Sequence, residues 1–194
     1  MKITELLSKN TILLNIEGNQ KEATIDQLVN VLYNSGKISD RAEFKAAILK
    51  REEQSTTGIG DGIAIPHAKT KVVKEAAIVF GKSATGVNYE SLDGKPAHLF
   101  FMIAAPDGAN NTHLEALARL SGLLMKAEVR YELLKATTPE EILDTINRYD
   151  KEDKQETVTT TETKKSFIVA VTGCPTGIAH TYMSADSLKA KADE

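Results

Sequence analysis

Cysteine is almost absent from this chain, and its scarcity sets the first limit on what the protein can be. Cys174 is the single cysteine among 194 residues, so an internal disulfide is impossible and a reducing cytoplasm is the expected setting. An excess of basic charge is lacking as well. The formal net charge is -3, and no basic stripe alternates with aromatic residues, so the sequence gives no case for binding nucleic acid.

Long apolar runs are also missing. No run approaches the roughly 20 residues that a membrane-spanning helix needs, so we expect no direct insertion of this segment into a membrane. The N-terminal stretch MKITELLSKNTILLNI is amphipathic and interrupted by Lys9 and Asn10, which argues against a secretory signal or a transit peptide. The composition, 41% hydrophobic and 26% charged, is typical of a globular protein with one good-sized core.

Patterns of helix and strand alternate along most of the chain. A short opening helix and the strand-like TILLNI come first, and the spacing of apolar residues then predicts helices at 20–36, 40–54, 114–125, 129–134 and 139–146. The continuous apolar runs AAIVFGKS and HLFFMIAAP predict strands covered on both faces, with a turn at LDGKP between them. The expected fold class is α/β: a layered α/β/α domain with a mixed β-sheet flanked by helices on both faces, over residues 1–149.

The composition changes after this domain. Residues 150–165, DKEDKQETVTTTETKK, carry mixed charge and almost no apolar side chains, which predicts a flexible, solvated linker. Residues 166–194 then read as a buried strand, a short glycine-bearing loop and the start of a helix, the first unit of a parallel α/β domain. Because one strand and one helix cannot bury enough surface to fold alone, we expect either a fragment of a longer domain or a disordered tail.

The segment TGIGDGIAIPHAKT, residues 57–70, places a histidine directly after a proline. Its glycines make the chain easy to bend, whereas Pro66 fixes its own φ and biases the preceding residue toward an extended conformation. His67 is therefore expected directly after a conformationally restricted residue, at the end of a flexible loop. Arg51, at the end of the preceding helix, and His113, in the first turn of a later one, are further candidates for the same site.

These three side chains suit a phosphoryl group. An imidazole is a nucleophile, a guanidinium binds phosphate oxygens in a fork, and a histidine in the first turn of a helix meets anions drawn to the exposed N–H groups there. No fixed spacing proves that the three meet. The alternatives for His67 are a structural role, in which the ring satisfies a backbone group, and a zinc site with Glu115 or Asp107, although neither HExxH nor a cysteine pair is present. His98, inside an apolar run, is expected to be a core or strand-end histidine.

Cys174 lies between a strand-like run and Pro175, in the loop CPTGIAHT. Backbone N–H groups of such a loop at a helix N-terminus would cradle a phosphate and favour the thiolate, which is a nucleophile toward phosphorus. The alternative is a buried, inert cysteine. A phosphatase loop would usually have an arginine six residues further on, where this chain has His180, so onward transfer is favoured over net hydrolysis.

Two stretches resemble a known family. Arg51 and GIGDGIAIPHAKT, followed by NTHLEALARL, resemble the fructose/mannitol/nitrogen class of enzyme IIA (EIIA) of the bacterial phosphoenolpyruvate-dependent sugar phosphotransferase system (PTS), over residues 1–149. The stretch VTGCPTGIAHTYMSADSL resembles the opening of a fructose-type enzyme IIB (EIIB) domain. In this order they resemble a fructose-type permease polypeptide whose EIIB domain, here the strand, loop and helix of residues 166–194, is incomplete.

The resemblance implies a cytoplasmic phosphotransferase that needs neither a cofactor nor a metal. The histidine phosphocarrier protein, HPr, would pass its phosphoryl group to Nε2 of His67, with Arg51 and His113 stabilising the group. His67 would then pass it to Cys174 of a complete EIIB domain, which phosphorylates fructose or a related sugar as the membrane domain EIIC carries the sugar in. Association with the membrane would come through EIIC.

Further expectations and alternatives accompany this reading. Ile59, Ile63 and Ile65 are expected to form an apolar collar that keeps water from the histidine. A regulatory phosphorylation switch of the nitrogen-type EIIA class remains an alternative, although such a domain needs no cysteine acceptor. A metal-dependent hydrolase is a third candidate, and stoichiometric metal in the purified protein would support it.

Overall fold

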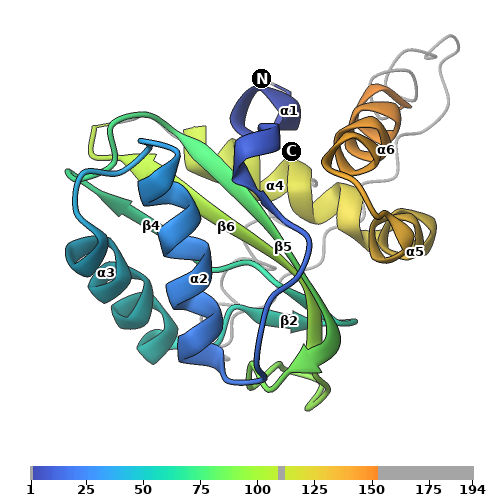
Figure 1. Ribbon diagram of the computed structural model, residues 1–194, viewed down its shortest axis with the longest axis horizontal. Helices are drawn as coiled ribbons and strands as arrows, with labels where there is room; N and C mark the ends of the chain where they lie inside the picture. Colours follow the sequence, from blue (N-terminus) through green and yellow to red (C-terminus); the bar gives the residue numbers. More distant parts are fainter. Residues whose placement is uncertain (1, 109–111, 153–194) are drawn as a thin grey trace, which may run out of the picture. The chain divides into compact units, whose positions relative to one another are not determined.

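The computed structural model describes residues 2–108 and 112–152 of the chain (Figure 1). The chain divides into two compact units, and all described residues belong to the first, Met1–Val158. Most of the predicted linker, the incomplete second domain and Cys174 therefore lie outside the described residues. None of the described helices is both long and apolar enough to cross a membrane.

A mixed β-sheet forms the centre of the domain. Its strands are β1 (Ile12–Leu13), β2 (Gly58–Gly60), β3 (Ile63–Ala64), β4 (His67–Thr70), β5 (Ala77–Val87) and β6 (Ala97–Pro106). The order across the sheet is β1-β5-β6-β3-β2, and β4 also pairs with β6. The central strands β5 and β6 are antiparallel, whereas β1 runs parallel to β5, and β3 and β4 run parallel to β6.

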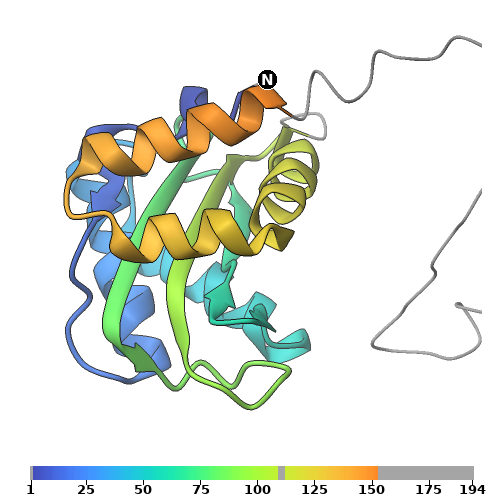
Figure 2. The same cartoon turned by 90° about the vertical axis from the view of Figure 1, so that its right-hand side faces the viewer.

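Helices cover both faces of this sheet, which confirms the predicted fold class. They are α1 (Ile3–Leu6), α2 (Lys21–Asn34), α3 (Arg41–Gln54), α4 (Thr112–Met125), α5 (Ala127–Lys135) and α6 (Pro139–Glu152), with a short 3₁₀ turn at Lys9–Thr11. One face packs against α2 and α3, and the other packs against α1, α4, α5 and α6. Figure 2 shows α4, α5 and α6, in yellow and orange, in front of the sheet.

The central strands are buried on both faces because successive side chains point to opposite sides. On β5, Val79 packs in the core cluster under α2 and α3, whereas its neighbours Ile78 and Phe80 pack in the cluster under α4, α5 and α6. On β6, Phe100 and Phe101 divide in the same way, and Phe101 meets Phe80 edge to face with ring centroids 5.1 Å apart. The prediction of strands covered on both faces is confirmed.

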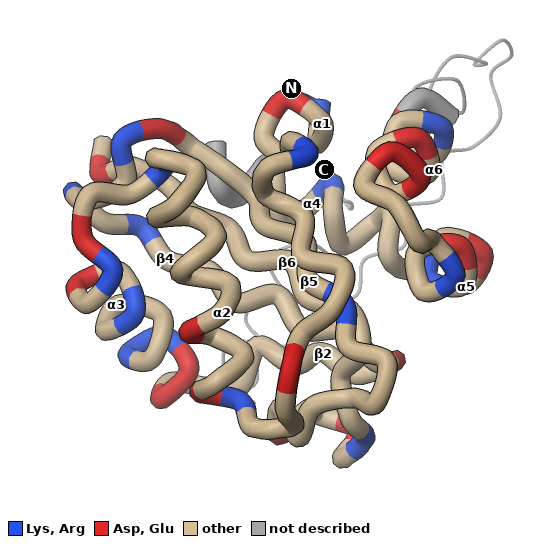
Figure 3. Tube along the Cα trace, in the orientation of Figure 1, with Lys and Arg blue, Asp and Glu red and all other residues tan. Residues whose placement is uncertain are grey.

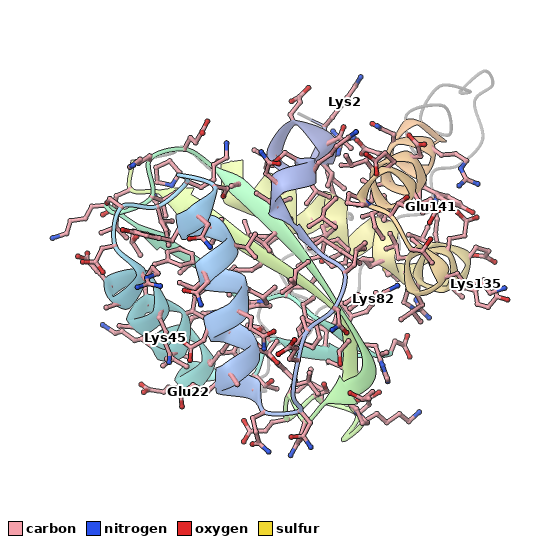
Figure 4. All side chains as sticks on the ribbon, in the orientation of Figure 1. Lys2, Glu22, Lys45, Lys82, Lys135 and Glu141 are labelled. Atoms are coloured by element: carbon pink, nitrogen blue, oxygen red, sulfur yellow. The ribbon has the colours of Figure 1, made fainter. Side chains whose placement is uncertain are left out.

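Helix α3 carries the predicted Arg51 in its last turn. Asp40 is the N-cap of this helix, because its Oδ1 accepts from the backbone N–H of Glu43 at 2.9 Å. Basic residues recur along the helix (Figure 3, blue). One of them, Lys45, reaches α2 (Figure 4), where its Nζ lies 2.9 Å from Glu22 and 2.8 Å from Asp26. With its N-terminal half fixed to α2, α3 packs against β4.

Helix α6 starts at the predicted Pro139 and runs to Glu152. Asp150, where the linker was expected to begin, is buried. Its carboxylate accepts from the guanidinium of Arg119 and from the backbone N–H of Ile3. The predicted linker therefore begins too early, because residues 150–152 continue the last helix of the folded domain.

The glycine-rich segment before His67 is a β-hairpin and not the flexible loop expected from its glycines. Strands β2 and β3 pair antiparallel around Gly60, Asp61 and Gly62, which all have positive φ (95°, 52° and 76°). The backbone N–H of Asp61 donates to the carboxylate of Asp93 at 3.1 Å, and the carboxylate of Asp61 lies 3.3 Å from the guanidinium of Arg130. The glycines therefore serve a tight turn that needs positive φ and that neighbouring segments hold in place.

Candidate functional site

A groove of about 470 Å³ lies between the last turns of α3 and the start of β4. It brings together two of the predicted site residues, Arg51 and His67. The remaining lining residues are Ala47, Lys50, Gln54, Ala68, Lys69 and Ile103. Alanine and isoleucine side chains thus supply apolar surface, and the long polar side chains supply positive charge.

His67 is the first residue of β4, where it pairs with Ile103 of β6. The preceding residue, Pro66, is buried and held in place, since its carbonyl accepts from the backbone N–H of Ile103 at 2.9 Å. The ring is half-buried, and its Nδ1 lies 2.8 Å from the carbonyl oxygen of Ile65. Because a carbonyl oxygen only accepts, Nδ1 carries the proton, and a neutral ring then holds its lone pair on Nε2.

The expected structural role of His67 is therefore realised by one ring nitrogen and is compatible with a chemical role for the other. The Nδ1 contact with Ile65 satisfies a backbone carbonyl, as that alternative required. The same contact sets the orientation and the tautomer of a ring that lines a groove. A purely structural histidine would not need the groove or the cations that share it.

Arg51 is held at the groove by the chain that follows its helix. Its Nη1 donates to the carbonyl oxygen of Ser55 at 3.0 Å and lies 3.4 Å from the hydroxyl oxygen of the same residue. These bonds satisfy a carbonyl just past the end of α3, where a cation also interacts favourably with the helix dipole. The guanidinium is thereby anchored beside His67 while presenting a planar set of donors suited to phosphate.

Sequence reasoning missed Lys50 and Lys69, which are exposed and line the groove. Together with Arg51 they give the groove three cations, and none of the lining residues in the described part of the chain is a carboxylate. Such a site attracts a doubly charged phosphoryl group. Lys69 could have been found from the sequence, because side chains two residues apart on a strand, such as His67 and Lys69, lie on the same side.

His113 is the second residue of α4, so the predicted position in a first helical turn is confirmed. The side chains of residues 112–115, including this imidazole, lie outside the described part of the chain. Cys174 also lies outside the described residues.

The predicted apolar collar of isoleucines around His67 is wrong. Ile63 and Ile65 are only 2% and 3% exposed and belong to the core on the side of α4, α5 and α6, whereas Ile59 on β2 is 46% exposed. The position of β3 inside the sheet, between β6 and β2, explains the error, because the chain from Ile63 to Pro66 is buried at every residue. The apolar surface of the groove comes instead from Ala47, Ala68 and Ile103.

Two further expectations from the sequence concern His98 and a metal site. The ring of His98 is half-buried, and its Nδ1 lies 3.0 Å from the carbonyl oxygen of Ser83, as expected of a strand-end histidine. In the described part of the chain, no group of three or more His, Cys, Asp or Glu side chains is arranged to hold a metal ion.

The fold and the groove together define an α/β domain that presents a histidine with a fixed tautomer beside an arginine and two lysines. The chain belongs to the EIIA 2 family of the phosphoenolpyruvate-dependent sugar phosphotransferase system, whose family model matches residues 5–149. The predicted resemblance of this domain is therefore confirmed.

Particular relatives narrow the comparison. The chain is 60% identical over 198 residues to the PTS system fructose-specific EIIABC component of Bacillus subtilis (strain 168), across 100% of this chain but only 31% of that relative. It is similar to the crystal structure of nitrogen regulatory protein IIA-Ntr from Neisseria meningitidis, with a TM-score of 0.69 and 29% identity, over 73% of this chain and 97% of that one. It is also similar to IIAMTL in the complex with phosphorylated IIBMTL from Escherichia coli, with a TM-score of 0.64 and 26% identity, over 73% and 96% of the two chains.

Proposed function

We propose that this domain is a phosphoryl carrier in which Nε2 of His67 accepts a phosphoryl group and passes it on. The observation that supports this role most directly is the hydrogen bond of 2.8 Å from Nδ1 of His67 to the carbonyl oxygen of Ile65. It leaves the lone pair of the neutral ring on Nε2, so the imidazole attacks without a separate base.

The accepting step balances with a phosphohistidine donor. The lone pair of Nε2 on His67 forms a new N–P bond while the N–P bond of the donor breaks, and the electron pair returns to the donor imidazole. Positive charge that develops on the accepting ring is stabilised by the bond from Nδ1–H to Ile65. The oxygens in transfer carry negative charge, which Arg51, Lys50 and Lys69 offset. We retain His113 as a further stabilising residue because it stands in the first turn of α4.

We further propose the partners on either side of this step. The donor is HPr, the acceptor is the thiolate of Cys174 in a complete EIIB domain, and the sugar is fructose or a close relative, carried by a membrane-embedded EIIC domain that tethers this cytoplasmic segment. Residues 1–149, with the end of α6 through Glu152, form the EIIA domain, the rest of 150–165 is the linker, and 166–194 is the start of EIIB. The support is the identity of 60% to a fructose-specific EIIABC component over this whole chain, together with the similarity to EIIA in a complex with phosphorylated EIIB.

Intact-mass measurement after incubation with phosphoenolpyruvate, enzyme I and HPr tests the first step. Wild type is expected to gain one acid-labile phosphoryl group, and His67→Ala is expected to gain none. His98→Ala is the matched control, because His98 also bonds a backbone carbonyl through Nδ1 but lines no part of the groove, and it should be phosphorylated like wild type. An unmodified wild type in the presence of active carriers would overturn the proposal.

A regulatory switch is the second candidate, favoured by the structural similarity to nitrogen regulatory protein IIA-Ntr. The two functions differ in the fate of the phosphoryl group. In a polypeptide extended to a complete EIIB domain, a carrier passes the group from His67 to Cys174, and Cys174→Ser leaves it on the histidine. Retention on His67 in the presence of an intact Cys174 would favour the regulatory role.

A further inference from the structure

The last turn of α3 holds a buried carboxylate directly beside Arg51. Glu52 is 9% exposed, and groups from three separate segments surround its two oxygens. Oε2 accepts from the backbone N–H of Thr57 at 3.1 Å and from Nζ of Lys21 at 2.9 Å. Oε1 accepts from the hydroxyl of Thr57 and, at 3.3 Å, from the hydroxyl of Tyr89. Because a buried carboxylate needs these donors, the side chain of Glu52 and the groups that donate to it are held in one arrangement.

The donors around Glu52 keep the protonation states that this network needs. Desolvation by burial acts to lower the pKa of Lys21, but hydrogen bonds to Glu52 and Glu90 outweigh it and raise that pKa. Burial, and then the charge of Glu52, raise the pKa of the Tyr89 hydroxyl well above its usual range. Lys21 therefore stays charged and Tyr89 stays neutral, so both donate to the carboxylate.

A series of hydrogen bonds runs from Glu52 to the ring of His67. The carboxylate accepts from the N–H of Thr57, and the carbonyl of Thr57 accepts from the N–H of Ile65 at 3.0 Å. The carbonyl of Ile65 in turn accepts from Nδ1 of His67 at 2.8 Å. These bonds fix the positions of Thr57 and then of Ile65. The ring that lines the groove is thus connected to α3 through two residues, Thr57 and Ile65, that flank the β2–β3 hairpin.

Arg51 and Glu52 fix the same short connection from two sides. Arg51 bonds the carbonyl of Ser55, and Glu52 bonds both the N–H and the hydroxyl of Thr57. This connection, residues 55–57, joins the helix that carries the guanidinium to the hairpin that leads to the imidazole. The carbonyl of Ile65 accepts the hydrogen bond from the ring of His67. A shift of Thr57 would therefore move this carbonyl relative to Arg51.

We propose that Glu52 is a positioning residue for phosphoryl transfer, which holds Thr57 and Ile65 so that His67 keeps its Nδ1–H tautomer and its orientation toward Arg51. This inference rests on the proposed function of His67. Glu52 contacts neither the ring nor the groove, since its oxygens bond Thr57, Lys21 and Tyr89. Its effect on the reaction is therefore transmitted through the backbone.

The test uses Glu52→Gln in the full chain. Glutamine has nearly the same volume, but it is uncharged and only its amide oxygen accepts, so the N–H and hydroxyl of Thr57 and the ammonium of Lys21 can no longer all donate to this side chain. Two measurements follow: the tautomer of His67 from the ¹⁵N chemical shifts of its ring, and the rate of its phosphorylation by phosphoramidate, a small donor that needs no protein partner. We expect the Nε2–H tautomer to become populated and the rate to fall by about tenfold or more, as for other small displacements of a reacting group.

Glu90→Gln is the matched control, because it removes the other carboxylate that Lys21 contacts, at 3.1 Å, and leaves the bonds between Glu52 and Thr57 in place. It should keep the wild-type tautomer and rate. A folded Glu52→Gln with unchanged tautomer and rate overturns the inference. If that variant does not fold, Glu52→Asp, which keeps the charge but draws the carboxylate back from the N–H of Thr57, decides by the same two readouts. A wild type that phosphoramidate does not modify overturns the proposed function instead, and the tautomer alone then decides the role of Glu52.

Discussion

His67 bonds the carbonyl of Ile65, the residue two positions before it, with 2.8 Å between Nδ1 and the oxygen. Pro66 stands between them, and its fixed φ together with its carbonyl bond to Ile103 leaves that step little freedom. The tautomer of the imidazole is therefore set by residues adjacent in sequence. The charge around the ring comes from Lys50 and Arg51 of α3 and from Lys69 of β4.

Arg51→Lys is expected to slow phosphorylation of His67 while leaving the fold intact. Lysine keeps the charge but loses the planar fork, so it cannot bond Ser55 and bind phosphoryl oxygens in the same geometry. A charged hydrogen bond contributes roughly 1.5–3 kcal/mol, which corresponds to a rate lower by about tenfold to a hundredfold. The measurement is the initial rate with HPr or phosphoramidate as donor. Arg41→Lys, at the other end of the same helix, is the control, and equal rates for the two variants would count against a role for Arg51.

Lys69→Glu is expected to slow the approach of an anionic donor more than Lys71→Glu. Lys69 lines the groove, whereas Lys71, two residues further on, has a side chain 77% exposed and lies outside the lining. Reversing a charge close to the site changes the interaction by about 1 kcal/mol or more in water, and the effect should shrink as salt is added. Initial rates with phosphoramidate at low and high salt provide the test. If both variants behave alike, the groove does not steer anions through Lys69.

Most of the fold could be predicted because its strongest signals are local. The run from Ala77 is apolar at nearly every position, and such a run in a helix-rich sequence indicates a strand covered on both faces. The hairpin β2–β3 could not be predicted, since its strands are three and two residues long. Its glycines indicated a bend correctly, but the contacts that hold the bend, from Asp93 and Arg130, come from distant segments.

The sequence identified residues of the site, but it could not show that they lie together. Proline before His67 and arginine at the end of a helix are features of sequence, but their meeting depends on the packing of α3 against β4. Glu52 was passed over because a glutamate near a helix end reads as a solvated residue. Only the structure surrounds it with Thr57, Tyr89 and Lys21.

Gly58→Ala and Gly122→Ala are expected to change stability in opposite directions. A Cβ at Gly58 would lie 2.7 Å from Oγ and 2.9 Å from Cα of Ser91, and since the latter is backbone, the hairpin must shift, at a cost of about 1–3 kcal/mol. A Cβ at Gly122, within α4, meets nothing within 4 Å. There alanine should stabilise the helix by about 0.5–1 kcal/mol. Urea denaturation followed by circular dichroism gives both values, and a neutral Gly58→Ala would show that the hairpin yields easily.

Glu141 is expected to stabilise the domain at neutral pH and to lose this effect in acid. It lies in the first turn of α6 (Figure 4), where Oε2 accepts from the backbone N–H groups of Thr137 at 2.6 Å and Thr138 at 3.3 Å. The bond from Thr137, followed by that from Thr138, lowers the pKa of this carboxyl below its ordinary 4.5. A carboxyl with a depressed pKa in the folded state binds its proton more readily when unfolded, so its contribution is complete above the ordinary value and disappears as the pH falls through the folded one.

Wild type should therefore be more stable than Glu141→Gln at neutral pH, and the difference should shrink once the pH falls below 4.5. Urea denaturation of both proteins across that range measures it. The reciprocal cap, from the N–H of Glu141 to the hydroxyl of Thr138 at 3.3 Å, persists in the glutamine variant, so the comparison isolates the charge of residue 141. A difference in stability that stays constant with pH would mean that the ionised carboxylate contributes nothing beyond what an amide oxygen provides as an acceptor.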